Sequence, residues 1–132
     1  MPTIKHADLS VTTDRPLDRA TVIVSCDVEF TDVEVNAMNV LGLRYRLDCR
    51  VLNKYLLEQD PVVTYRHHSY PRFASEGRQY EHAVFETNVS MAAMNEHIFG
   101  KDTLVAELTL KNEETGEQVV ERSEEIKIDL AA

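Results

Sequence analysis

Two stretches of the chain carry an apolar residue at every second position. In residues 21–30 and 43–51 these positions hold Val22, Val24, Cys26, Val28 and Phe30, then Leu43, Tyr45, Leu47, Cys49 and Val51. Successive side chains of a β-strand point to opposite faces, whereas a helix would scatter the same groups around its circumference. The pattern therefore predicts two half-buried strands.

The same reasoning predicts shorter or weaker strands elsewhere. They lie at residues 4–11, 62–68, 80–89, 104–110, 117–122 and 126–130, which gives about eight strands in all. The polar run 112–116 ends in Gly116 and predicts a hairpin between 104–110 and 117–122. If 62–68 and 80–89 also pair as a hairpin, the histidine-rich middle of the chain lies on two neighbouring strands.

Two connections between strands have a helical composition. Residues 36–41 end at Gly42 and residues 90–99 end at Gly100, and glycine suits the left-handed residue that follows a helix. Both segments contain Ala-Met-Asn, at 37–39 and 93–95, and both follow a predicted strand that contains Phe. We therefore expect two equivalent crossovers, each carrying the chain from one sheet to the other.

Several short strands without a long helix predict an all-β protein, an antiparallel two-sheet β-sandwich. The pattern is similar to immunoglobulin-like and fibronectin-III-like sandwiches, most of all in the ending from Leu104 through Thr115-Gly116 to Arg122. True immunoglobulin domains would show a core Trp and a wider cysteine spacing, and this chain has no Trp. The length of 132 residues fits a single domain, residues 1–132.

Composition and charge narrow the expected partners. A chain that is 43% hydrophobic and contains 4 Gly and 4 Pro should fold, and its net charge of −9 disfavours nucleic acid or an anionic membrane as partner. Residues 44–78 are an exception, with seven basic and four acidic side chains. The candidate ligand or interface residues in this segment include Arg44, Arg46, Arg50 and Arg66. They indicate either a basic surface for an anionic ligand or a second copy, or ordinary cross-strand charge pairing.

The absence of a long apolar run and of a signal-like start leads us to expect a cytoplasmic protein. Thiols stay reduced in that compartment. Cys26 and Cys49 lie in phase with the apolar residues of their strands, so we expect both side chains to point inward as buried thiols. A disulfide between them is the alternative if their strands are neighbours or face one another.

The histidines of the middle segment are candidate metal ligands. Across the proposed hairpin, His68 and His82 would lie opposite one another, but His67 and Glu81 would point to the other face. A catalytic zinc takes three protein ligands, so a third would have to come from a loop, for example His97. The alternative is that these imidazoles are rim or cross-strand residues.

A ligand site around this cluster would also use His67, Tyr70, Arg72 and Tyr80, and would suit a small enzyme or binding protein. No nucleotide-binding motif or nucleophile elbow is present, so we expect no cofactor and favour a non-enzymatic protein-interaction module, a homodimer or part of a larger assembly. The crossover residues Met38, Met91 and Met94 either close the core or form an exposed patch for a partner.

Overall fold

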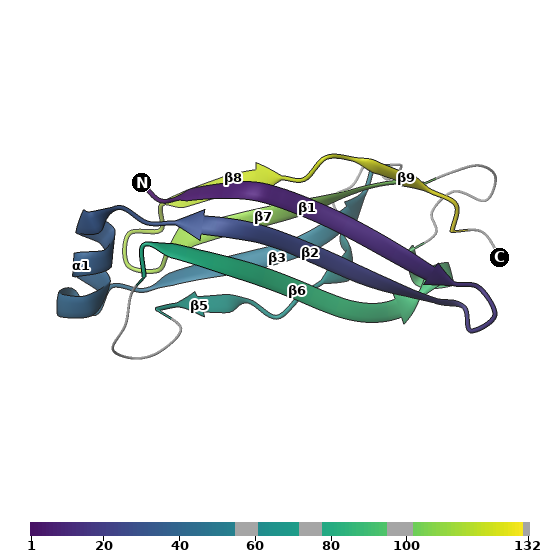
Figure 1. Cartoon of the computed structure of the whole chain (residues 1–132), viewed down its shortest axis with the longest axis horizontal. Helices are drawn as coiled ribbons and strands as arrows, with labels where there is room; N and C mark the ends of the chain where they lie inside the picture. Colours follow the sequence, from purple (N-terminus) through teal and green to yellow (C-terminus); the bar gives the residue numbers. More distant parts are fainter. Residues whose placement is uncertain (55–60, 72–77, 95–101, 131–132) are drawn as a thin grey trace.

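The computed structural model describes residues 1–54, 61–71, 78–94 and 102–130, and it is mostly β (Figure 1). The elements in chain order are β1 (Thr3–Asp14), β2 (Arg19–Glu29), α1 (Asp32–Leu41), β3 (Tyr45–Asn53), β4 (Pro61–Thr64), β5 (His68–Tyr70), β6 (Tyr80–Ser90), α2 (Met91–Met94), β7 (Asp102–Asn112), β8 (Gln118–Arg122) and β9 (Ile126–Ile128). None of the helices in these residues has the length and apolar character needed to cross a membrane.

The strands form two antiparallel sheets. A 3-stranded sheet has the order β1-β2-β6, and a 6-stranded sheet has the order β4-β3-β7-β8, with β5 also paired to β3 and β9 also paired to β7. The inward faces of both sheets share one apolar core, to which β2 contributes Val22, Val24, Cys26 and Val28 and β7 contributes Leu104, Ala106, Leu108 and Leu110. The prediction of two antiparallel sheets is thereby confirmed.

Both crossovers carry the chain from one sheet to the other, as predicted. The chain passes from β2 through α1 to β3, and from β6 through α2 to β7. Because β2 pairs with β6 and β3 pairs with β7, both crossovers leave the 3-stranded sheet and enter the 6-stranded sheet at neighbouring strands. The methionines of both crossovers are buried: Met38, Met91 and Met94 are 4%, 1% and 0% exposed, so they close the core.

Helix α1 begins four residues earlier than its composition suggests, at Asp32 instead of residue 36. Thr31 is the N-cap: its hydroxyl accepts a hydrogen bond from the Glu34 backbone N–H, and the Glu34 carboxylate accepts one from the Thr31 backbone N–H. This capping box satisfies two backbone donors and fixes the start of the helix. Gly42, at a φ of 72°, ends the helix as predicted.

The predicted strand at 62–68 is wrong in two respects. It is two short strands, β4 and β5, and both pair with β3 instead of forming a hairpin with β6. The partner of β6 is β2. The described part of the chain therefore has nine strands in place of about eight, while the predicted hairpin at 112–116 forms between β7 and β8, with Gly116 at a φ of 80°. Of the helix predicted at 90–99, residues 95–99 lie outside the described residues.

Candidate functional site

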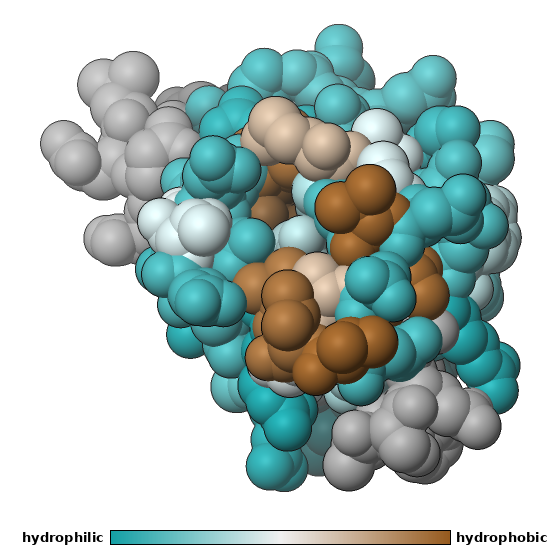
Figure 2. Space-filling model, turned by 90° about the vertical axis from the view of Figure 1, so that its left-hand side faces the viewer, coloured by the Kyte–Doolittle hydropathy of each residue, from teal (hydrophilic) through white to brown (hydrophobic). Residues whose placement is uncertain are grey.

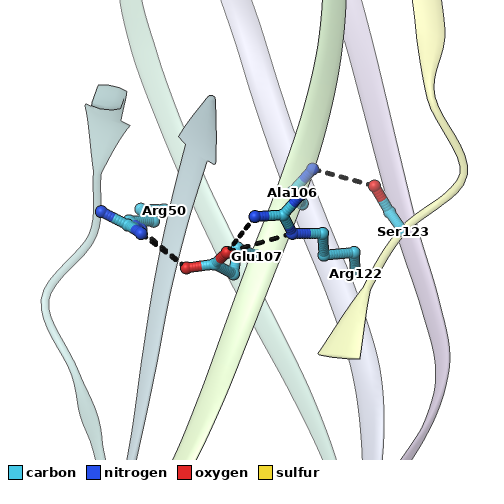
Figure 3. A network of polar contacts seen from close by, with 5 residues as sticks. All are labelled: Arg50, Ala106, Glu107, Arg122 and Ser123. Atoms are coloured by element: carbon cyan, nitrogen blue, oxygen red, sulfur yellow. Dashed lines mark hydrogen bonds and ion pairs between the residues drawn. The ribbon is translucent and has the colours of Figure 1, made fainter. Parts of the chain in front are cut away.

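A buried carboxylate lies between two arginines on the outer face of the 6-stranded sheet (Figure 3). Arg50 of β3 and Arg122 of β8 flank Glu107 of β7 in one cross-strand row. Oε1 of Glu107 accepts from Nε and Nη2 of Arg50 at 2.9 and 2.7 Å, and Oε2 accepts from Nε and Nη2 of Arg122 at 3.1 and 2.8 Å. The carboxylate thus holds two guanidinium groups in fixed positions.

Two further rows complete this outer face. The strand register aligns Asp48, Thr109 and Val120 in one row, and Arg46, Lys111 and Gln118 in the next. Arg46 donates from Nε to Oδ2 of Asp48 at 3.1 Å. We call the nine residues of these three rows the grid: Arg46, Asp48, Arg50, Glu107, Thr109, Lys111, Gln118, Val120 and Arg122. An open groove of about 480 Å³ lies over part of the grid; its lining is Asp48, Arg50, Glu107, Thr109, Gln118 and Val120 of the grid, together with Cys49, Thr64 and Tyr65.

The arginines determine how Glu107 responds to pH. Burial alone would raise the pKa of Glu107, but the hydrogen bonds and positive charges of Arg122 and Arg50 outweigh it and lower the pKa from its ordinary value of 4.5. A carboxylate with a lowered folded-state pKa stabilises the fold above its unfolded pKa, and this contribution is lost as the pH falls through the folded pKa.

We therefore expect Glu107→Gln to lower the free energy of unfolding by roughly 1–3 kcal/mol at neutral pH, the cost of weakened hydrogen bonds to charged groups. The difference between wild type and variant should shrink as the pH falls below 4.5, because wild-type Glu107 then becomes protonated. Urea unfolding of both proteins, from neutral pH to below pH 4.5, measures this difference in the free energy of unfolding. Glu86→Gln, at an exposed position of β6, is the control and should change little; an equal loss at every pH would contradict the assignment.

The outer face of the 3-stranded sheet holds a second polar cluster around Asp27. Nδ1 of His82 lies 2.8 Å from Oδ1 of Asp27, and Nδ1 of His6 lies 2.8 Å from Oδ2. The hydrogen bond with His82 is the main cause that lowers the pKa of Asp27 to about 2, with further contributions from His6 and Tyr80. His6 has a φ of 56° and sits at a break in the register of β1. This bulge, which directs His6 toward Asp27, was missed because no sequence pattern marks it.

The structure separates the two histidines proposed as metal ligands. His82 lies on the 3-stranded sheet opposite Asp27, whereas His68 lies on the 6-stranded sheet opposite Leu47 and stacks on Phe85 with ring centroids 4.2 Å apart. The predicted juxtaposition of His68 and His82 is therefore wrong, because their strands do not pair. Within the ranges that the structure describes, no group of three His, Cys, Asp or Glu side chains is arranged to hold a metal ion. His97 lies outside those ranges.

The remaining candidate residues do not converge on one place. Tyr70 is 1% exposed and its ring packs against Phe30, with centroids 5.7 Å apart. His67 and Arg66 are exposed between β4 and β5, and Tyr80 is 52% exposed beside Asp27. Arg44 is exposed just before β3, whereas Arg46 and Arg50 belong to the grid. Arg72 lies outside the described residues.

Helix α1 exposes several large apolar side chains. Val33, Val40 and Leu41 are 78%, 71% and 79% exposed. Figure 2 shows apolar side chains gathered on the end of the molecule that carries α1. With about 3.6 residues per turn, the spacing of Val33, Ala37, Val40 and Leu41 places them on one stripe of the helix, which we call the outer stripe. Met38, the buried residue of α1, faces the core instead.

The sequence pattern placed the residues of the outer stripe in a crossover but did not predict that they are exposed. It did not identify Glu107, Lys111 and Arg122 as site residues. Their alignment with Arg50 and Arg46 depends on the strand register, which exists only in the folded sheet.

Comparison of the chain with models of known protein families, with curated proteins and with solved structures found no match. The geometry of α1 and of the grid is therefore the basis for any functional conclusion.

Proposed function

We propose that this chain is a non-enzymatic protein-interaction module that pairs with a second copy of itself through the outer stripe of α1. The observation that carries the proposal is the exposure of Val33, Val40 and Leu41 on a helix whose other side is already packed by Met38. A helix that is apolar on both its inner and outer sides is normally buried on both. Exposed apolar patches of this kind often mark protein-binding surfaces.

A second copy fits this surface because the charges at the two ends of α1 are opposite. Asp32 lies in the first turn, and the exposed Arg44 follows the last turn. If two copies of α1 pack antiparallel about a two-fold axis, Asp32 of each copy lies near Arg44 of the other, and the same patch serves both partners. The two helix dipoles also point in opposite directions in this arrangement, which is electrostatically favourable.

The size of the surface predicts a weak dimer. A helix of 10 residues is about 15 Å long, so the paired area falls below that of a typical stable interface. We expect a dissociation constant on the order of 100 µM, which corresponds to a free energy of dissociation of about 5.5 kcal/mol. Light scattering at low and high salt should show a mass that rises with concentration in both. A monomer under both conditions at high concentration would contradict the proposal.

A matched pair of substitutions localises the contact. Leu41→Gln removes an apolar side chain from the outer stripe but keeps a good helix former, so the fold should be kept. Leu17→Gln makes the same change at a residue that is 67% exposed in the turn after β1, at the opposite end of the molecule. We expect Leu41→Gln to weaken dimerisation at least about tenfold, because apolar contact area is lost and a polar amide must be desolvated in its place. Equal effects of the two variants would show that α1 is not the interface.

We further propose that the arrangement of the two sheets is that of an immunoglobulin-like or fibronectin-III-like sandwich. Two antiparallel sheets of 3 and 6 strands around one core, with the β7–β8 hairpin near the end of the chain, support this assignment. Such sandwiches commonly serve as interaction domains, but the same architecture carries many functions, so the assignment adds only general support.

A further inference from the structure

In the described part of the chain, β6 is a long strand that is paired along one edge and not along the other. All eleven residues of β6, Tyr80–Ser90, pair with β2 in an unbroken register. No other described strand pairs with β6, which is the last strand of its sheet (Figure 1). Alternate residues of such a strand direct backbone N–H and C=O groups away from the sheet, where they can pair with another chain.

The other described sheet edges have features that protect an edge from pairing. The register of β1 is broken between Lys5 and Asp8, and β1 also contacts β7 and β8 of the other sheet. The 6-stranded sheet ends in short strands, with β5 and β4, which begins at Pro61, on one side and β8 and β9 on the other. Bulges, proline and short strands each discourage the addition of a strand. The sequence of β6 contains no proline, glycine, lysine or arginine, so its edge is the most open of those described.

Two side chains on the outer face of β6 would lie beside an added strand. Val84 is 48% exposed, and its neighbour across the sheet is Ser25. Glu86 is exposed in a row with Ile23 and Ser10, and its carboxylate makes no ion pair or hydrogen bond with the described residues. Directly opposed side chains on neighbouring strands stabilise a sheet when they are both apolar or of opposite charge. An apolar residue opposite Val84 and a cation opposite Glu86 would therefore complete these two rows.

Charge favours a basic partner at this edge over a second copy of the chain. β6 carries the two carboxylates Glu81 and Glu86 and no Lys or Arg. A second β6 would bring two more carboxylates and offer no Lys or Arg to any of the four, whereas a basic segment would be attracted. The described strand pairs of this sheet are all antiparallel, so we expect an added strand to be antiparallel to β6.

We propose that the free edge of β6 binds an extended segment of a partner protein as an added antiparallel strand, with a Lys or Arg opposite Glu86 and an apolar side chain opposite Val84. Backbone hydrogen bonds supply most of the affinity in this mode of recognition, and side-chain pairs select the sequence. Residues on one face of a strand are two apart, so the recognised pattern is a basic residue, any residue and an apolar residue. The inference does not depend on the pairing of α1, because α1 and β6 share no residue.

The test is an NMR titration of the full chain with the synthetic peptide acetyl-Thr-Lys-Val-Ile-Thr-Thr-Lys-amide, in which Lys-Val-Ile supplies the pattern. The backbone amide signals of Val84, Phe85 and Glu86 should shift and saturate with a midpoint on the order of 1 mM. Replacement of both Lys residues of the peptide by Glu should weaken binding at least about fivefold. Shifts that never saturate, or that centre away from β6, would overturn the proposal. Shifts at β6 on concentrating the protein alone would also overturn it, because a second copy would then cover the edge.

Two N-methylated forms of the peptide test whether it binds as a strand. In an antiparallel ladder, alternate residues direct their N–H toward the neighbouring strand. One form carries backbone N-methyl groups at every second residue, and the other carries them at the remaining residues. We expect one form to lose binding, because its methyl groups face β6, and the other to retain it. Loss of binding by both forms, or by neither, would show that the peptide does not add to the sheet.

Two matched pairs of variants place the binding on β6. Val84→Lys puts a cation on the edge and should weaken peptide binding at least about fivefold. Val120→Lys makes the same change at a residue that is 47% exposed on β8 and should leave the midpoint unchanged. Glu86→Gln should weaken binding about two- to fivefold, the effect of losing one exposed ion pair, whereas Glu121→Gln, also at an exposed residue of β8, should not. Equal midpoints within either pair would overturn the proposal.

Discussion

Replacing Phe30 by Ala should cost about 3–5 kcal/mol of folding free energy, the range for removal of a buried phenyl ring. Phe30 is 1% exposed and lies just after β2, where its ring contacts Tyr45 of β3 and Tyr70 of β5, with centroids 5.0 and 5.7 Å away. The ring therefore connects the end of one sheet to two strands of the other. Small proteins have a net stability of about 5–15 kcal/mol, so the loss would be a large fraction of the total.

The measurement is equilibrium unfolding in urea at neutral pH. Phe30→Leu retains much of the apolar volume and should cost roughly 1.5 kcal/mol or less. Val84→Ala, at an apolar residue that is 48% exposed, should cost about 0.5 kcal/mol or less. A loss for Phe30→Ala no larger than that for Val84→Ala would mean that Phe30 does not join the two sheets.

Neither cysteine should react with an alkylating reagent in the folded protein. Cys26 and Cys49 are free thiols that are 0% and 2% exposed. Burial, with a smaller contribution from the charge of Asp27, raises the pKa of Cys26 from 9.0 to about 12. Burial and the neighbouring Cys26 also raise the pKa of Cys49. Because the thiolate is the nucleophile, a rise of this size lowers the reactive fraction of Cys26 about a thousandfold at pH 8.

Mass spectrometry after iodoacetamide treatment checks this expectation. In native buffer the protein should remain unmodified, and in concentrated urea both thiols should be alkylated. Asn36→Cys, at an exposed position of α1, supplies the internal control and should react rapidly in native buffer. Modification of Cys26 or Cys49 in native buffer at the rate seen in urea would show that the core is open at this point.

The period-two pattern was sufficient to predict most of the strands. It identified the inward faces of β2 and β3 because each alternation places five apolar groups on one side, and it predicted both cysteines as buried. It failed at residues 62–68, because the one strand that it predicted there is two short strands, β4 and β5. Val63 of β4 is buried, and His68 of β5 packs on Phe85. Pairing partners depend on sheet order, which alternation does not encode.

The candidate functional surfaces were harder to predict for the same reason. Arg50 and Arg46 were chosen from local charge, but their partners Glu107 and Lys111 lie about 60 residues later in the chain and meet them only through the β3–β7 register. The pairing of His68 with His82 assumed a hairpin that the fold does not contain. The exposure of Val40 and Leu41 depends on which side of α1 faces the core, and the short helix leaves that choice open to tertiary packing.

The most direct test of the proposed α1 interface uses a spin label on Asn36→Cys, since the two native thiols should stay unlabelled. Spin-labelled chains are mixed with isotopically labelled wild-type chains, and line broadening between molecules is read at each backbone amide. We predict broadening at α1 and Arg44, and none at Leu17 in the distant turn after β1. Two results would contradict this interface. One is the absence of broadening at concentrations where light scattering shows dimers, and the other is broadening centred on a part of the molecule other than α1.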